Sequence, residues 1–271
     1  MDKRRLILLT ALLACLPFTA WAGGDDFGWI PGFEVTKQFN KRLDLSFDGE
    51  LRTRNGFKNV DRFDLGLSVS YDLFDFLKIN GGYSYLRTYK PREITLKDLV
   101  TVQDAEGNAT QYQEYNDEAK YATDRHRFYA SLTGEYKVSR FVFSLRERVQ
   151  YTYQEEATTD KTKYRYSSSL GSVTAKSTQS DTISAKNKTM LRSRLMVKWD
   201  IRKCKFEPYA SYELSNWINN GGILDKTRVT VGTKYKITKQ SSLDLYYLYQ
   251  QQNDNDEADG HFIGLSYNLK F

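Results

Sequence analysis

The chain has 271 residues, a formal net charge of +6, and acidic and basic residues mixed along its length. A nucleic-acid-binding protein would concentrate its basic residues on one face, so the charge pattern argues against that class. Cys15 and Cys204 are the two cysteines. Because Cys15 falls in a predicted leader, we expect no intrachain disulfide in the mature chain.

The first 22 residues read as a cleaved signal peptide. Lys3, Arg4 and Arg5 form a charged region, residues 6–18 are apolar, and Ala20-Trp21-Ala22 is a small-residue cleavage signal. The alternatives are an uncleaved anchor and a lipoprotein signal with Cys15 as the acylated residue. We therefore predict that residues 1–22 are removed and that residues 23–271 form one domain.

Beyond the leader, apolar and polar residues alternate with a period of two, which indicates strands. No later stretch approaches the roughly 20 apolar residues that a membrane helix needs. Segments of about ten or more alternating residues instead fit strands that cross a bilayer as a barrel. The clearest segments are residues 41–52, 63–73, 77–85, 128–136, 141–153, 191–201, 206–214, 229–237, 243–249 and 263–271.

The strand count is less definite than the strand pattern. Counting an additional segment at residues 27–39 gives about eleven strands, whereas bacterial single-chain barrels have an even number. We expect an all-β, transmembrane antiparallel meander barrel of about 12 strands. Ten strands remain possible if the first segment stays outside the wall.

The connections alternate between tight and long, as in outer-membrane barrels with short periplasmic turns and long extracellular loops. The longest loops are expected at residues 89–124 and 155–186. The first is net acidic, and its carboxylates could hold calcium or simply be solvated. The second is rich in Ser, Thr and Lys and is interpreted as mobile. The acidic residues of the first loop are Asp104, Glu106, Glu114, Asp117 and Glu118.

Aromatic residues of the outward parity fall at both ends of the predicted strands, as expected for interfacial girdles. A soluble periplasmic β-sandwich is the alternative fold. The last segment has apolar residues at every second position and ends on Phe271. Outer-membrane barrels share this terminal pattern, which implies the barrel-assembly machinery as a partner, with outer-membrane lipid around the wall. The sequence does not indicate an oligomeric state.

The inward parity carries many charges, which are costly in a narrow lumen unless they pair. Arginine suits such pairing because its planar fork binds carboxylates through two hydrogen bonds. One interpretation is a salt-bridged plug, and the other is an arginine ladder that attracts an anionic ligand. The predicted lumen charge network is Glu50, Arg52, Arg127, Glu135, Arg146, Arg148, Arg192, Arg194, Glu207 and Glu213.

Glu147 shares the outward parity near the middle of its strand, where an acidic group would face lipid. We expect either a lipid or protein contact centred on Glu147 or a β-bulge that turns it inward. His126 and His261 have outward parity near the long-loop rim, so they are predicted to contact lipid headgroups or to be neutral girdle residues rather than catalytic groups. We therefore expect no catalytic residues, no metal site and no cofactor.

Several segments resemble a family of uncharacterised bacterial outer-membrane β-barrels, common in Bacteroidetes, known as the domain of unknown function numbered 2490. The resemblance implies a barrel in the cell outer membrane of a Gram-negative bacterium and implies no activity. The segments that carry it are Glu50-Leu51-Arg52-Thr53-Arg54, Arg125-His126-Arg127-Phe128-Tyr129, residues 144–153 (SLRERVQYTY) and Phe206-Glu207-Pro208-Tyr209.

Together these features predict a non-enzymatic outer-membrane barrel that acts as a narrow channel or as a structural or binding component. One alternative is a lipid-modifying enzyme of the phospholipase or acyltransferase type. Another is a transport or secretion partner that uses the surface around Glu147.

Overall fold

The computed structural model describes residues 26–103, 107, 109–167, 172–253 and 259–271. The predicted signal peptide, with the lipoprotein alternative at Cys15, lies outside the described residues, as do Asp104 and Glu106. No helix among the described residues is long and apolar enough to span a membrane. A single 3-10 turn, η1 (Ile218–Asn220), is the helical element that the structure describes.

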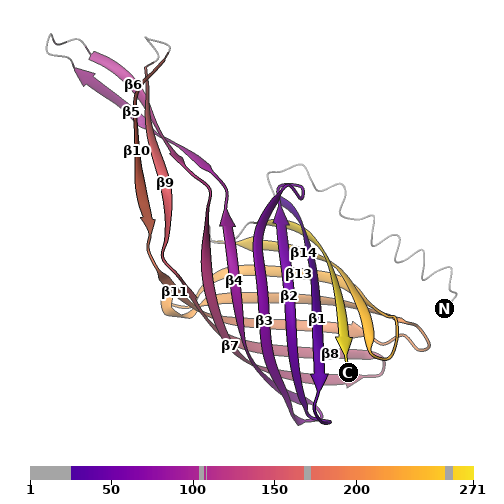
Figure 1. The fold of residues 1–271 in the computed structure, drawn as a ribbon. Helices are drawn as coiled ribbons and strands as arrows, with labels where there is room; N and C mark the ends of the chain where they lie inside the picture. Colours follow the sequence, from indigo (N-terminus) through magenta and orange to yellow (C-terminus); the bar gives the residue numbers. More distant parts are fainter. Residues whose placement is uncertain (1–25, 104–106, 108, 168–171, 254–258) are drawn as a thin grey trace.

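The described part of the chain forms a closed barrel of eleven strands (Figure 1). Its wall runs in the order β1-β15-β14-β13-β12-β11-β8-β7-β4-β3-β2 and returns to β1. The strands are β1 (Asp26–Gln38), β2 (Leu43–Arg54), β3 (Asn59–Phe74), β4 (Leu77–Lys90), β7 (Tyr121–Val138), β8 (Phe141–Gln154), β11 (Lys186–Trp199), β12 (Phe206–Trp217), β13 (Ile223–Lys236), β14 (Ser241–Gln252) and β15 (Gly260–Lys270).

The expected count of about 12 strands, or 10, is therefore wrong, and the count of eleven from the alternation is right. Neighbouring strands pair antiparallel except at the seam, where β1 and β15 run parallel, with Trp29 opposite Ile263. An odd number of strands requires this, because the first and last strands of an odd meander run in the same direction. The barrel is thus mixed rather than wholly antiparallel.

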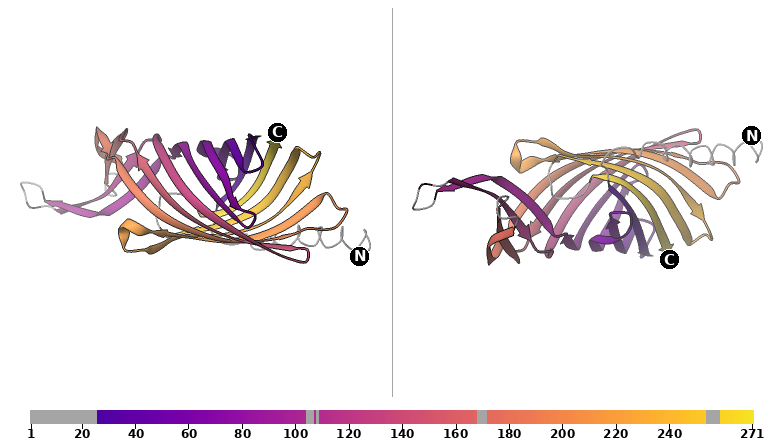
Figure 2. Two further views of the ribbon diagram at one scale, coloured as in Figure 1. Left: turned by 90° about the horizontal axis from the view of Figure 1, so that it is seen from below. Right: turned by 90° about the horizontal axis from the view of Figure 1, so that it is seen from above.

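The two longest predicted loops are also not loops. Their described residues form a four-stranded antiparallel sheet, in the order β10-β9-β6-β5, that projects beyond the barrel as an extension (Figures 1 and 2). The described part of the segment interpreted as mobile forms a hairpin, because its threonines and tyrosines favour strands once a partner strand is available. The extension comprises β5 (Glu93–Gln103), β6 (Ala109–Glu118), β9 (Ala157–Ser167) and β10 (Ser172–Ile183).

Short turns lie at one end of the barrel, between β1 and β2, β3 and β4, β7 and β8, β11 and β12, and β13 and β14. We call this the short-turn end. The opposite, long-loop end carries the extension and the remaining connections. Phe271 lies at the short-turn end, where its carbonyl accepts a hydrogen bond from the Gln38 amide at 2.7 Å. Polar contacts therefore join the last residue of the chain to the first strand.

The alternation predicted from the sequence separates the two faces of the wall. Apolar side chains near the strand middles point outward and stay exposed, among them Leu67, Val69, Leu132, Leu145, Val149, Leu195 and Leu245. A small apolar cluster of Ile30, Leu248 and Phe262 fills one side of the interior, with Tyr246 packed against it. Polar and charged side chains occupy most of the remaining interior.

Candidate functional site

The centre of the lumen is organised around one carboxylate, Glu213 on β12, which is only 5% exposed. Glu213 Oε1 accepts a hydrogen bond from Arg192 Nη2 at 2.6 Å, and Oε2 accepts one from Arg146 Nη2 at 2.7 Å. Arg228 Nη1 approaches Oε1 at 3.7 Å. Three arginines from β11, β8 and β13 therefore converge on one acid, because inward positions of neighbouring strands lie side by side in register.

The contacts continue from Arg228 across the seam to β2. Arg228 Nε donates to Gln250 Oε1 at 2.8 Å, and Arg52 Nη1 donates to the same oxygen at 3.3 Å. Arg52 also lies 3.6 Å from Glu50, and its guanidinium stacks over the Phe262 ring, 5.0 Å from its centroid. A buried amide thus bridges two arginines that would otherwise repel one another.

Ion pairs extend these contacts along β2, β3 and β7. Arg62 Nη2 donates to Glu50 Oε1 at 3.0 Å, and Asp64 Oδ2 lies 3.5 Å from Arg127 Nη1 and 4.0 Å from Arg62 Nε. On the other side, Arg192 Nη1 donates to Gln150 Oε1 at 3.0 Å. We call this continuous set the charged belt: Gln150, Arg192, Glu213, Arg146, Arg228, Gln250, Arg52, Glu50, Arg62, Asp64 and Arg127.

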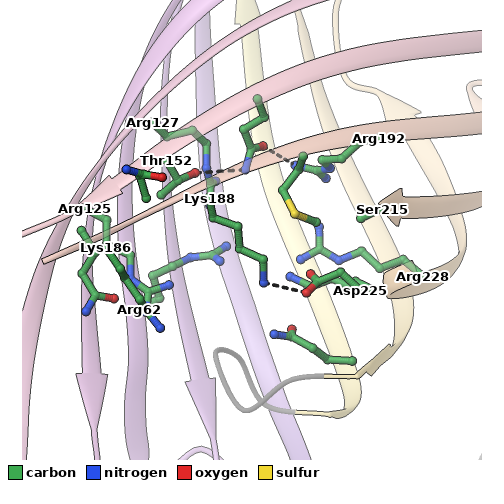
Figure 3. A pocket seen from close by; sticks show the side chains of 16 residues that line it. Arg62, Arg125, Arg127, Thr152, Lys186, Lys188, Arg192, Ser215, Asp225 and Arg228 are labelled. Carbon is green, nitrogen blue, oxygen red and sulfur yellow. Dashed lines mark hydrogen bonds and ion pairs between the residues drawn. The ribbon is translucent and has the colours of Figure 1, made fainter. Parts of the chain in front are cut away.

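A basic vestibule lies on the long-loop side of the belt (Figure 3). Its cavity has a volume of about 70 Å³, and one acid, Asp225, lines it. Lys188 Nζ donates to Asp225 Oδ1 at 2.6 Å, so that carboxylate is already neutralised. The basic lining residues are Arg62, Arg125, Arg127, Lys186, Lys188, Arg192, Lys226 and Arg228. An excess of one sign in a low-dielectric cleft concentrates small ions of the opposite sign.

A larger cavity of about 450 Å³ lies toward the short-turn end. Acids line it from β1, β2 and β3, bases line it from β4, β7, β8 and β11, and serine hydroxyls stand between them. We call it the lower cavity. Its charged lining residues are Glu34, Asp48, Glu50, Asp64, Lys78, Arg127, Arg146, Arg148 and Arg194.

Most of the predicted lumen residues meet inside the barrel. Six belong to the belt, and Arg148 and Arg194 lie in the lower cavity. Glu135 is exposed, and Glu207 forms an ion pair with Lys236 near the short-turn end, so both lie apart from the belt. The six are Glu50, Arg52, Arg127, Arg146, Arg192 and Glu213.

Five belt residues were not in the predicted network: Arg62, Asp64, Gln150, Arg228 and Gln250. Arg62 has the same inward parity as Asp64 on β3. Gln250 has the same inward parity as Leu248 on β14. A strict reading of parity would have found them. The bridging role of Gln250 carries no sequence signal, because it depends on two arginines brought together across the β1–β15 seam.

Glu147 points outward from β8, and the β-bulge alternative is wrong. The register of β8 with β7 and β11 runs through this position without a shift, pairing Glu147 with Leu132 and Ser193. The Ser193 hydroxyl donates to Glu147 Oε2 at 2.6 Å. One hydrogen bond therefore partly satisfies an acid on an otherwise apolar face.

The two histidines lie outward among tyrosines near the long-loop end. His126 Nδ1 hydrogen-bonds the Tyr83 hydroxyl at 2.8 Å, and Nε2 lies 2.9 Å from Glu155 Oε1. His261 Nδ1 lies 2.5 Å from the Tyr247 hydroxyl. Both imidazoles also stack on tyrosine rings, at centroid distances of 6.1 Å for Tyr83 and 5.9 Å for Tyr247.

Acids of the extension that were considered for calcium pair with arginine instead. Arg92 Nε donates to Asp117 Oδ1 at 2.5 Å, and Arg165 Nη2 donates to Glu114 Oε1 at 2.6 Å. The hydrogen bond from Arg92 lowers the pKa of Asp117 below its ordinary value. These two carboxylates are therefore committed to ion pairs with arginine within the extension.

Comparison with known proteins confirms the family resemblance. The family model described as "Protein of unknown function (DUF2490)" matches residues 31–261. The chain belongs to this family. A search of curated proteins gave no match. Among solved structures, the CymD monoaromatic hydrocarbon channel is similar over 84% of this chain and 82% of its own, with 10% identity and a TM-score of 0.34.

Proposed function

We propose that the protein is a non-enzymatic outer-membrane barrel that forms a narrow channel for small anionic solutes. The observation that carries the proposal is the basic vestibule, where eight cationic side chains and one acid line the long-loop side of the lumen. Beneath it, the belt arginines provide guanidinium groups that an anion could contact in sequence. Buried belt side chains occupy part of the lumen, so the channel would select by size as well as by charge.

Three features support an outer-membrane location. Apolar side chains cover the outside of the wall, aromatic residues occur outward near both of its ends, and the eleven wall strands form a closed barrel without a free edge. The short-turn end would face the periplasm and the extension would project outside the cell. Phe271 would be the terminal residue read by the barrel-assembly machinery, and lipid would surround the wall.

Planar-bilayer recording tests the proposal. In a KCl gradient, the purified protein should give discrete current steps whose reversal potential shows preference for chloride. Replacing Arg125 and Lys186 with Gln should reduce that preference, because both line the vestibule. Arg202→Gln removes a cationic side chain from an exposed turn and serves as the matched control. A silent protein or a cation-selective one would contradict the proposal.

Two other roles have specific observations behind them. The Tyr83–His126–Glu155 contacts favour a lipid-modifying enzyme as the second candidate, since a base needs an orienting partner. Turnover of labelled phospholipid, lost in His126→Ala or His261→Ala, would establish it.

The Glu147–Ser193 pair on the apolar exterior favours a lipid or protein contact, which Glu147→Leu should weaken as measured by lipid extraction and oligomeric state.

A further inference from the structure

The lower cavity holds two arginines that the charged belt does not use. The Arg148 guanidinium packs over the Tyr129 ring, 4.1 Å from its centroid, and Nε of both Arg148 and Arg194 is buried without a hydrogen-bond partner. Among the described residues, neither guanidinium forms an ion pair with a carboxylate. The other bases of the cavity are engaged: Arg127 and Arg146 in the belt, and Lys78 with Asp72 at 3.3 Å.

Two acids of the same cavity, like the two arginines, form no ion pair among the described residues. Asp48 on β2 and Glu34 on β1 line the cavity, and no basic side chain among the described residues forms an ion pair with either. Glu34 accepts one hydrogen bond, from the Thr36 hydroxyl at 3.1 Å. The other acids of the cavity, Glu50 and Asp64, are held by Arg62.

The four groups lie on opposite walls. Around the ring of eleven strands, β1 and β2 are adjacent. By the shorter route, β8 and β11 each lie five strands from β1, and they lie four and five strands from β2. Glu34 and Asp48 therefore face Arg148 and Arg194 across the lumen. The field in the lower cavity runs from the arginine wall to the acid wall, across the barrel axis.

We propose that the lower cavity binds a small zwitterionic solute that lies across the lumen. Its carboxylate would contact Arg148 and Arg194, and its ammonium group would contact Asp48 and Glu34. The inference goes beyond the proposed anion channel, because it assigns a second class of solute, with both charges, to the lower cavity.

Size and charge both favour this class over a simple anion. A cavity of about 450 Å³ falls within the range of small-molecule sites, roughly 300–1,000 Å³. An anion would neutralise the arginine wall and leave the acids opposite it unpaired, and a cation would do the reverse. A molecule with both charges satisfies both walls at once, and the serine hydroxyls between them can hydrogen-bond its polar atoms.

Three probes with the same four-carbon chain test the inference: 4-aminobutyrate, butyrate and butylammonium. Isothermal titration calorimetry on the purified full chain in detergent measures binding without requiring conductance. We expect 4-aminobutyrate to bind about tenfold more tightly than either singly charged probe, or better, since it makes charge-assisted contacts at both walls. Equal or tighter binding of butyrate would show an anion site only and overturn the inference, as would no detectable binding of 4-aminobutyrate.

Paired substitutions test which wall of the lower cavity binds which charged group of the solute. Arg148→Gln with Arg194→Gln should abolish binding of 4-aminobutyrate, whereas Glu34→Gln with Asp48→Asn should lower its affinity to that of butyrate. Asp75→Asn, in an exposed turn, is the control. Heat-modifiable gel mobility reports whether each variant has folded, and the probe series on the unaltered chain remains decisive if one has not. Chloride-selective currents without zwitterion preference would refute this inference alone and leave the proposed channel standing.

Discussion

Replacement of Glu213 by Gln tests whether the charged belt stabilises the barrel. The substitution keeps the size and one acceptor oxygen of the side chain but removes the charge that Arg192, Arg146 and Arg228 share. Because Glu213 is only 5% exposed, water cannot replace it. Removing one partner of a buried ion pair costs about 3–5 kcal/mol, since the remaining charge stays buried without compensation.

A loss of that size lowers the folding equilibrium constant by roughly 10² to 10⁴. Guanidinium unfolding of the purified barrel in detergent, followed by tryptophan fluorescence, measures it as a lower midpoint with an unchanged slope. Asp75→Asn removes an exposed acid and should change the free energy of unfolding by less than about 0.5 kcal/mol. If Glu213→Gln is equally mild, the belt is not a stabilising network and the reasoning fails.

Three further predictions concern the outer wall, the interior packing and the extension. Leu145 is 53% exposed at an outward position near the middle of its strand, so Leu145→Arg should destabilise the barrel in a bilayer by about 2–4 kcal/mol. Urea unfolding from lipid vesicles measures this loss, and an unchanged free energy of unfolding would argue against lipid contact. Gly264→Ala would place a Cβ 2.0 Å from Tyr246 Cζ, so we expect the free energy of unfolding to fall by about 1–3 kcal/mol. Adding Tyr246→Ala should largely restore it, and a loss that this second change leaves unaltered would contradict the predicted clash. Arg92 lowers the pKa of Asp117 in the folded chain. The Arg92–Asp117 ion pair therefore stabilises the extension fully above the ordinary pKa of 3.8, and this stabilisation is lost as the pH falls through the lower pKa of the folded chain. Hydrogen-exchange protection of β6 should fall in that range in the unaltered chain and not in Asp117→Asn.

The sequence predicted the barrel well because its strands face two different environments. Alternation at Leu65, Leu67 and Val69 against Asp64, Gly66 and Ser68 is a local signal that needs no knowledge of the partner strand. The inward parity likewise brought Glu213, Arg192 and Arg146 into one predicted network. Parity therefore determined both the fold class and most of the belt.

Features that depend on distant partners were not predicted. The parallel β1–β15 seam and the bridge from Gln250 to Arg52 join residues separated by almost the whole chain. The described extension residues include no buried apolar side chain, so the alternation of these strands is weak. Only the pairing of β6 with β9 joins two apparent loops into one sheet. The split of the lower cavity into an acid wall and an arginine wall follows from the strand order around the ring, which sequence parity does not provide.

The central claim is that odd and even positions of each strand face hydrocarbon on one side and a charged aqueous lumen on the other. Nitroxide labels placed one at a time from residue 143 to residue 149 of β8, with Cys204 replaced by Ser, test it directly in lipid vesicles. Collision with oxygen should peak at residues 143, 145, 147 and 149, and collision with a water-soluble nickel chelate should peak at residues 144, 146 and 148. Uniform access of the chelate to both sets would contradict the account.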